Sequence, residues 1–259
     1  YEGQQLGEIW GYVVDGYFKT DEEARNYKVD QSFVNQMINA SALDNGLHAG
    51  DLKFVDLDGN NKIEQTTSAN DRKDMKVIGN SLPRYNYNFG ISADWYGIDF
   101  SVLFEGIGKQ NWYPGAETSM FWGPYSRPYA SFIPSDFMSQ VWSEENTDAY
   151  FPRPRGYVAL GSNRELAVVN TKYLQNLAYC RLKNLSIGYT LPDKWLSKIG
   201  FEKIRVYFSG ENLLTFTKLH SDYIDPEQAS ASNSWKTSKS DANIYPWAKT
   251  YSFGVDITF

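Results

Sequence analysis

The chain has 259 residues, a net charge of −6 and a single cysteine, and it contains no uninterrupted apolar run of 18 residues. These features exclude a transmembrane helix, an internal disulfide and a cysteine-based zinc site, and the acidic charge argues against nucleic-acid binding. Aromatic residues make up 16% of an otherwise polar sequence, which favours membrane interfaces and sugar-binding surfaces, because Tyr and Trp combine an apolar ring with a polar tip. The first residues show no signal peptide, so we expect a mature chain or a fragment.

Six segments show the alternation of apolar and polar side chains that is typical of β-strands. In chain order they are 9–18, 84–95, 98–104, 185–191, 203–211 and 251–259. In the segment 84–95, Tyr87, Phe89 and Ile91 share one face with other apolar residues, and polar residues and glycine occupy the opposite face. A change of phase near Lys183 predicts a β-bulge just before the fourth segment.

The connections between these segments alternate between short and long. The short ones are Tyr96-Gly97 and 192–202, and the long ones are 19–83, 111–172 and 214–246. An up-and-down transmembrane β-barrel has this asymmetry, with short periplasmic turns and long extracellular loops, and the count places Phe259 at the periplasmic end. The alternative is a soluble or surface-attached β-sandwich that binds glycans, although such long loops are uncommon in compact domains.

Characteristic motifs occur along nearly the whole chain. They lie at Leu6–Phe18, Gly50–Ile63, Val77–Tyr85, Tyr173–Asn176, Arg181–Pro192, Tyr207–Leu214, Asp222–Glu227 and Tyr245-Pro246. In this order they resemble the C-terminal region of SusC/RagA-type TonB-dependent transporters. The resemblance implies an all-β fold in which residues 1–259 supply about six C-terminal antiparallel strands of a large transmembrane β-barrel, without the plug and the earlier strands.

For the whole protein, the resemblance implies energised import of oligosaccharides or peptides across the outer membrane of a Gram-negative bacterium. It also implies a SusD-like surface lipoprotein as partner, contact with TonB through the missing N-terminal region, contact with outer-membrane lipid, and no enzymatic activity. The terminal strand, with apolar residues at alternate positions from Tyr251 to Phe259, is similar to the signal that the outer-membrane assembly machinery recognises.

The segment Asp56–Glu64 spaces its oxygen-bearing side chains as the first nine positions of a calcium-binding EF-hand loop do. The predicted Ca²⁺ ligands are Asp56, Asp58, Asn60, the carbonyl oxygen of Lys62, Glu64 and Asp71. Asp71 is included because Thr67 stands where the EF-hand has its bidentate Glu, and Asn61 replaces the usual Gly at position 6. The alternative is a turn rich in Asp, Asn and Gly that binds no metal.

The connection 111–172 is dense in aromatic rings and prolines. Aromatic faces stack on sugar rings, so we predict substrate contacts at Trp112, Trp122, Tyr125 and Trp142. The alternative is that these rings pack the loop against its own neighbours, because large loops need a small core of their own.

A hydrolase interpretation would need a pair of carboxylates around a glycosidic bond. Glu144, Glu145 and Asp148 form the one tight acidic cluster, but adjacent loop residues point apart, and solvated acids are the simpler interpretation. The sequence also lacks a Ser-His-Asp set and a phosphate-binding loop. We therefore predict no catalytic residues.

Overall fold

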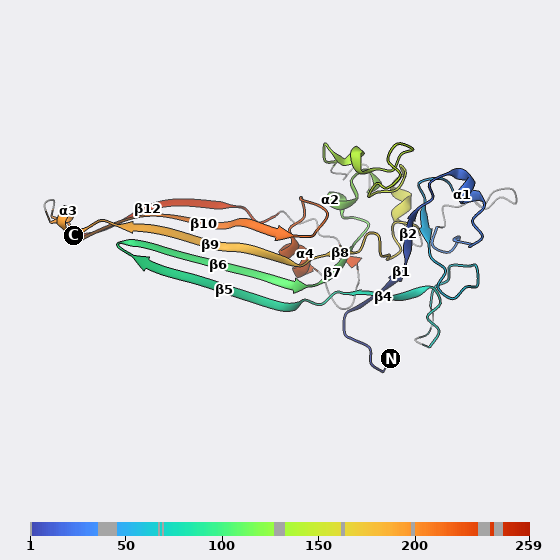
Figure 1. Ribbon diagram of the computed structural model, residues 1–259, viewed down its shortest axis with the longest axis horizontal. Helices are drawn as coiled ribbons and strands as arrows, with labels where there is room; N and C mark the ends of the chain where they lie inside the picture. Colours follow the sequence, from blue (N-terminus) through green and yellow to red (C-terminus); the bar gives the residue numbers. More distant parts are fainter. Residues whose placement is uncertain are drawn as a thin grey trace.

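Five long strands form a single antiparallel sheet in the order β12-β10-β9-β6-β5 (Figure 1). The strands are β5 (Arg84–Trp95), β6 (Ile98–Lys109), β9 (Tyr179–Thr190), β10 (Lys203–Thr217) and β12 (Thr250–Thr258). This computed structural model describes residues 2–35, 46–66, 68, 70–126, 133–161, 164–197, 200–232, 239–240 and 246–259. Within these residues β5 and β12 are the two edges, so the sheet does not close on itself.

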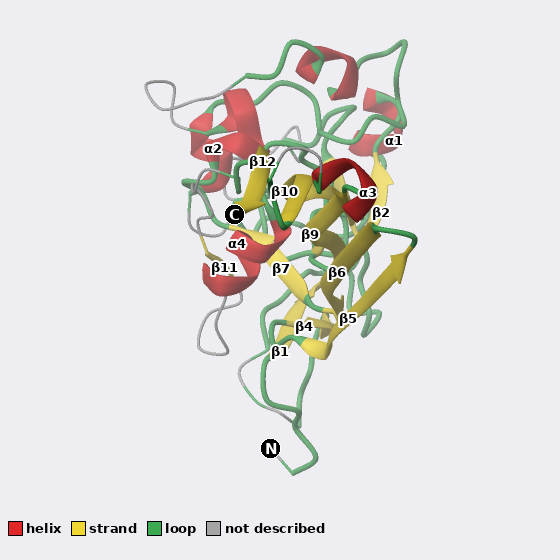
Figure 2. Ribbon diagram, turned by 90° about the vertical axis from the view of Figure 1, so that its left-hand side faces the viewer, coloured by secondary structure: helices red, strands yellow, loops and turns green. Residues whose placement is uncertain are grey.

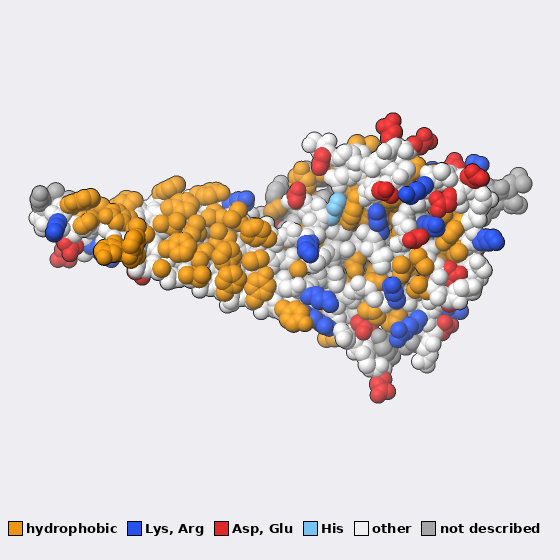
Figure 3. All heavy atoms as spheres, viewed as in Figure 1, with side chains coloured by type: hydrophobic (Ala, Val, Ile, Leu, Met, Phe, Trp, Pro, Cys, Tyr) orange, Lys and Arg blue, Asp and Glu red, His pale blue; other side chains and the backbone are white. Residues whose placement is uncertain are grey.

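The register places most apolar residues of the five strands on one side of the sheet, because side chains in a strand point to opposite faces with a period of two. Ile91 faces Val102 across β5 and β6, and Phe208 faces both Ile187 and Phe253. We call this side the apolar face: Phe89, Ile91, Trp95, Ile98, Phe100, Val102, Phe104, Leu185, Ile187, Tyr189, Val206, Phe208, Phe253 and Val255. Hydrophobic side chains cover the length of the sheet in Figure 3.

The opposite side carries polar side chains in matching rows. We call it the polar face: Asn86, Asn88, Ser92, Asp94, Asp99, Ser101, Glu105, Arg181, Ser186, Arg205, Ser209, Glu211, Ser252 and Asp256. One row crosses all five strands as serines that pair directly with one another, from Ser92 on β5 to Ser252 on β12. The sheet therefore separates an apolar environment from a polar one along its whole length.

Short connections lie at one end of the sheet and long ones at the other, as predicted. The Tyr96-Gly97 turn has φ values of 46° and 85°, which suit a two-residue hairpin turn, and α3 (Asp193–Leu196) belongs to the other short connection. The C-terminus lies at this same end in Figure 1. Figure 2, viewed from this end, shows the strands side by side with the long connections beyond them.

The predicted bulge is also present. Leu103 pairs with Asn184 and Phe104 pairs with Leu182, so Lys183 is the extra residue on β9. The extra residue changes the phase of β9, which is why the alternation in the sequence shifts at this position.

The segment 9–18 is extended but does not join the five-stranded sheet. It forms β1 (Glu8–Tyr12) and β2 (Val14–Tyr17), which pair with β4 (Met75–Asn80) and β3 (Leu52–Phe54) in separate two-stranded sheets. Ile9 and Tyr12 have opposite parity, yet both are buried. The long sheet has five strands among the described residues rather than the predicted six, because this segment lies in a globular core with contacts on both sides.

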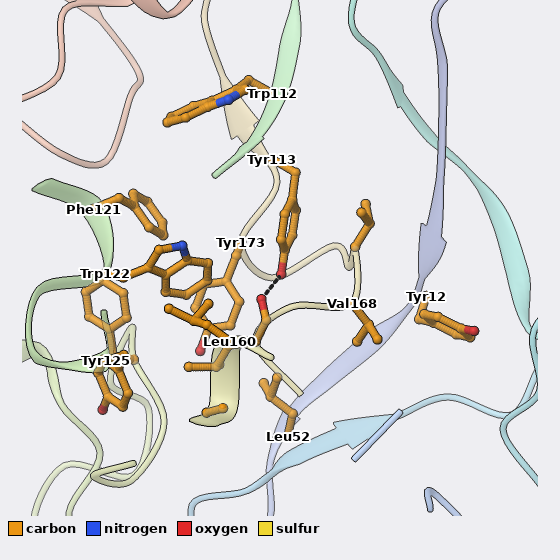
Figure 4. Close-up of a cluster of buried hydrophobic side chains, with 14 of the residues drawn as sticks. Tyr12, Leu52, Trp112, Tyr113, Phe121, Trp122, Tyr125, Leu160, Val168 and Tyr173 are labelled. Atoms are coloured by element: carbon orange, nitrogen blue, oxygen red, sulfur yellow. Dashed lines mark hydrogen bonds between the residues drawn. The ribbon is translucent and has the colours of Figure 1, made fainter. Parts of the chain in front are cut away.

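The long connections fold together into what we call the loop region, the described residues among 2–83, 110–178 and 218–249. Besides β1 to β4 its elements are α1 (Asp21–Arg25), β7 (Asn111–Pro114), α2 (Ser119–Trp122), three 3-10 helices (Gly123–Tyr125, Phe137–Gln140, Tyr157–Leu160), β8 (Gln175–Asn176), α4 (Pro226–Ser232) and β11 (Lys239–Ser240). Its core contains many buried aromatic rings (Figure 4). Among the described residues, no helix has the length and apolar character needed to cross a membrane.

Candidate functional site

Arg205 connects three strands on the polar face near the short turns. Its guanidinium donates to both carboxylate oxygens of Asp99, at 2.8 and 2.6 Å, and to Asp256 at 3.3 Å. Gly188 lies between them on β9, and a Cβ there would collide with Asp99 and Arg205. The glycine thus lets the guanidinium lie against the sheet, where it links β6, β10 and β12.

The start of the third long connection is anchored on the polar face at the other end of the sheet. Arg181 on β9 is 1% exposed and donates to Asp225 at 2.5 Å, to Glu227 at 2.7 Å and to Thr215 Oγ1 at 3.0 Å. Lys183 adds a 3.0 Å contact to Glu227. Charge-assisted hydrogen bonds of this kind hold α4 against the polar face, where the sheet meets the loop region.

The predicted calcium loop wraps around its own carboxylates. Asp56 accepts from the backbone N–H groups of Gly59 and Asn61, both at 2.7 Å. Asn61 takes the left-handed conformation, with φ of 61°, so it replaces the EF-hand glycine as expected. Asn60 Oδ1 accepts from the N–H of Lys62 at 2.8 Å, so the loop is a tight turn held by its own Asp and Asn side chains.

The carboxylate that completes this cluster is Asp74, which the sequence analysis did not include. Oxygen atoms of Asp56, Asp58 and Asp74 lie within 4.8 Å of one another. Asp71 instead forms an ion pair with Lys73, with 3.4 Å between Asp71 Oδ2 and Lys73 Nζ. Asp74 is buried, and burial together with the charges of Asp58 and Asp56 raises the pKa of its carboxyl.

The four aromatic residues predicted to bind substrate are all in the core of the loop region. Trp112, Trp122, Tyr125 and Trp142 are buried. Trp122 Nε1 donates to the carbonyl of Gly115, and the Tyr125 hydroxyl donates to the carbonyl of Pro152 (Figure 4 shows both rings). The Trp122 ring packs edge-on against Phe121 and Tyr173, and the Tyr125 ring stacks on Phe151. The burial of all four rings favours the packing alternative over the predicted substrate contacts.

A buried ion cluster that the sequence analysis missed joins two of the long connections. Asp51 is fully buried and accepts from Arg153 at 2.6 Å and from Arg155. Arg155 also donates to Glu165 at 2.7 Å. Burial raises the pKa of the Glu165 carboxyl, and the positive charge of Arg155 opposes this increase. Asp51 is more than 100 positions from both arginines in the sequence, so no local pattern could reveal the cluster.

The acidic residues considered for hydrolysis lie on the surface. Glu144, Glu145 and Asp148 are exposed, and Asp148 is 3.8 Å from Lys19 in a solvent-exposed ion pair. Solvated loop acids are what the structure shows at this position.

The architecture defines the class of protein. An antiparallel sheet with one apolar and one polar face, short turns at one end and long connections at the other, is a segment of a transmembrane β-barrel wall. TonB-dependent receptor P3 of Formosa agariphila is 28% identical over 264 residues, which is all of this chain and 22% of that protein. TonB-dependent receptor P39 of the same organism is 26% identical over 283 residues, again all of this chain and 25% of the relative. The chain therefore spans about a quarter or less of the curated relatives it matches.

Among solved structures, the RagAB peptide importer in its open-open state has the same fold, with a TM-score of 0.57 and 20% identity. The match covers 97% of this chain and 22% of that one. No family model matches the chain. The two relatives and the solved structure confirm the resemblance to SusC/RagA-type TonB-dependent receptors.

Proposed function

We propose that this chain forms part of the barrel wall and the outer loops of a TonB-dependent importer in the outer membrane of a Gram-negative bacterium. The observation that carries the proposal is the division of one continuous sheet into an apolar face and a polar face. The apolar face suits lipid, and the polar face suits the interior of a barrel. The names of the relatives support transport rather than catalysis.

The proposed importer takes up oligosaccharides or peptides as the SusC-like subunit of a SusCD-type complex. A SusD-like surface lipoprotein would contact the loop region, and TonB would act through a part of the protein outside this chain. The resemblance to SusC/RagA-type proteins supports both partners, and the RagAB peptide importer supports peptides as one of the two substrate classes.

The test is to localise the native gene product and to measure energised uptake in the bacterium that makes it. We expect that only detergent, and not plain buffer, extracts the protein from the outer membrane. We also expect substrate uptake to stop when an uncoupler collapses the proton gradient. A protein that stays soluble in plain buffer would contradict the proposal and support the β-sandwich alternative, because the apolar face would then have to be a core.

We also propose that the loop from Asp56 to Glu64 binds Ca²⁺, with Asp74 rather than Asp71 as the closing carboxylate. Three carboxylates with oxygen atoms within 4.8 Å of one another repel one another, and a hard divalent cation with oxygen ligands relieves that repulsion. Backbone N–H groups donate to both carboxylate oxygens of Asp56 and of Asp74. Each of these oxygens has a second lone pair, which could coordinate the cation.

Calorimetric titration of the purified native protein with CaCl₂ tests this site. Asp74→Asn is expected to weaken Ca²⁺ binding by about ten-fold or more, since affinity follows the number of charged ligands, whereas Asp71→Asn changes it little. Because the pKa of Asp74 is raised, protons compete with the metal above the pH at which an ordinary aspartate titrates, and binding weakens on acidification. Equal effects of the two substitutions would contradict the assignment of Asp74.

A further inference from the structure

The third long connection folds back onto the polar face of the sheet. Arg181 holds its helix α4 there, since the guanidinium donates to Glu227 at 2.7 Å and to Asp225, just before α4, at 2.5 Å. Arg181 projects from the polar face, because it pairs in register with Glu105 on β6 and with Thr215 on β10. Figure 2, viewed along the strands, shows α4 displaced to one side of the sheet.

This cover is confined to one end of β9. On the polar face of this strand, Tyr179 and Arg181 are buried, whereas Asn184, the next polar-face residue after the bulge, is exposed. The residues that pair with Asn184 in register, Leu103 and Glu211, are exposed as well. In the barrel proposed above, α4 therefore lies against the inner wall near the mouth, and the wall below it is open.

The segment that leads into α4 is fixed on its other side by the second long connection. Ser221 Oγ donates to the carbonyl of Met120 at 2.9 Å, and His220 Nε2 lies 2.8 Å from Gln140 Oε1. Ala229 of α4 is fully buried in the aromatic core of the loop region. With the sheet on one side and this core on the other, α4 is a fixed part of the fold.

Two flanks of α4 remain partly open. Glu227 points at the sheet, and Ala229 points into the core. Because an α-helix has about 3.6 residues per turn, Gln228 and Ser230 lie between these two directions, on opposite flanks. Both are half-buried, so each flank is partly accessible from the space beside the polar face.

We propose that α4 is a fixed constriction in the import path, at the mouth of the barrel. The inference rests on the proposed import function, because the polar face must enclose that path. A helix with its side chains is about 10–12 Å across, so α4 narrows the opening on this side by about that width. It thereby limits the size of the molecules that are imported.

The experiment places one cysteine on α4, in the full-length protein with its own cysteines, Cys180 among them, replaced by serine. Gln228→Cys is the test variant, and Glu22→Cys is the matched control, because Glu22 is exposed on α1 at the end of the loop region far from the sheet (Figure 1). Both purified variants are modified with biotin maleimide and then mixed with streptavidin. We expect the maleimide to react at both positions and streptavidin to bind only the control, because a biotin recessed in the mouth does not reach a protein of that size.

Energised uptake by the bacterium is measured in the same variants after labelling with a polyethylene glycol maleimide. The probe is the radiolabelled mixture of peptides and oligosaccharides whose uptake is lost when the gene is deleted. Uptake is expected to fall to the level of the gene deletion in Gln228→Cys and to stay unchanged in Glu22→Cys.

Three results would overturn the constriction alone: no maleimide reaction at position 228, streptavidin binding at both positions, or uptake that persists once Gln228→Cys is labelled. A gene deletion that removes no energised uptake of peptides or oligosaccharides defeats the import function itself, and the constriction with it.

Discussion

Ile187→Arg is expected to remove most of the folded protein from the outer membrane, whereas Ser186→Arg is expected to leave it in place. Ile187 is 42% exposed on the apolar face of the central strand, and Ser186 is its neighbour on the polar face. An arginine on the lipid side of a barrel costs up to about 2–4 kcal/mol, depending on its depth in the membrane, whereas the interior accepts charge. The measurement is the amount of heat-modifiable protein in purified outer membranes.

Ile187→Phe distinguishes lipid contact from an ordinary protein core. Lipid chains adapt to a larger side chain, so we expect this substitution to have little effect on folded protein. In a β-sandwich the apolar face would be closely packed, and the extra volume would cost about 1–3 kcal/mol. A clear loss of folded protein in Ile187→Phe would therefore argue against a lipid-facing side.

The strands could be predicted from the sequence because the membrane imposes a simple pattern on them. A strand between lipid and a polar interior must alternate at every residue, and β5 runs from Arg84 to Trp95 with the bounds that alternation predicts. The bulge at Lys183 was visible for the same reason, since one extra residue reverses the alternation. The segment 9–18 alternates too, but its partners are β3 and β4, and pairing of that kind leaves no trace in local periodicity.

The surroundings of the candidate site residues could not be predicted from the sequence, because they depend on contacts between distant residues. Trp122 packs on Tyr173, with ring centroids 5.2 Å apart, and nothing near Trp122 in the sequence shows whether its ring is covered or free. The Asp74 carboxylate meets those of Asp56 and Asp58 from beyond an insertion that has no counterpart in the EF-hand pattern. The spacing within Asp56–Glu64 was informative because those residues form a local turn with its own geometry.

Arg155→Leu is expected to destabilise the loop region by about 3–5 kcal/mol, because it leaves Glu165 as a buried charge without a partner and takes one of two arginines from Asp51. Both carboxylates are fully buried. The expected result is faster hydrogen exchange throughout the loop region of the purified protein, with the five-stranded sheet unchanged. The two parts respond differently because the cluster joins only the long connections.

Arg25→Leu is the matched control for this change. Arg25 lies 3.9 Å from Asp21 in an ion pair that is largely exposed on both sides, and such pairs contribute about 0–1 kcal/mol. Combining Arg155→Leu with Glu165→Leu should recover part of the lost stability, because the second substitution removes the charge that the first leaves unpaired. Equal hydrogen exchange in Arg155→Leu and Arg25→Leu would show that the buried cluster does not hold the two connections together.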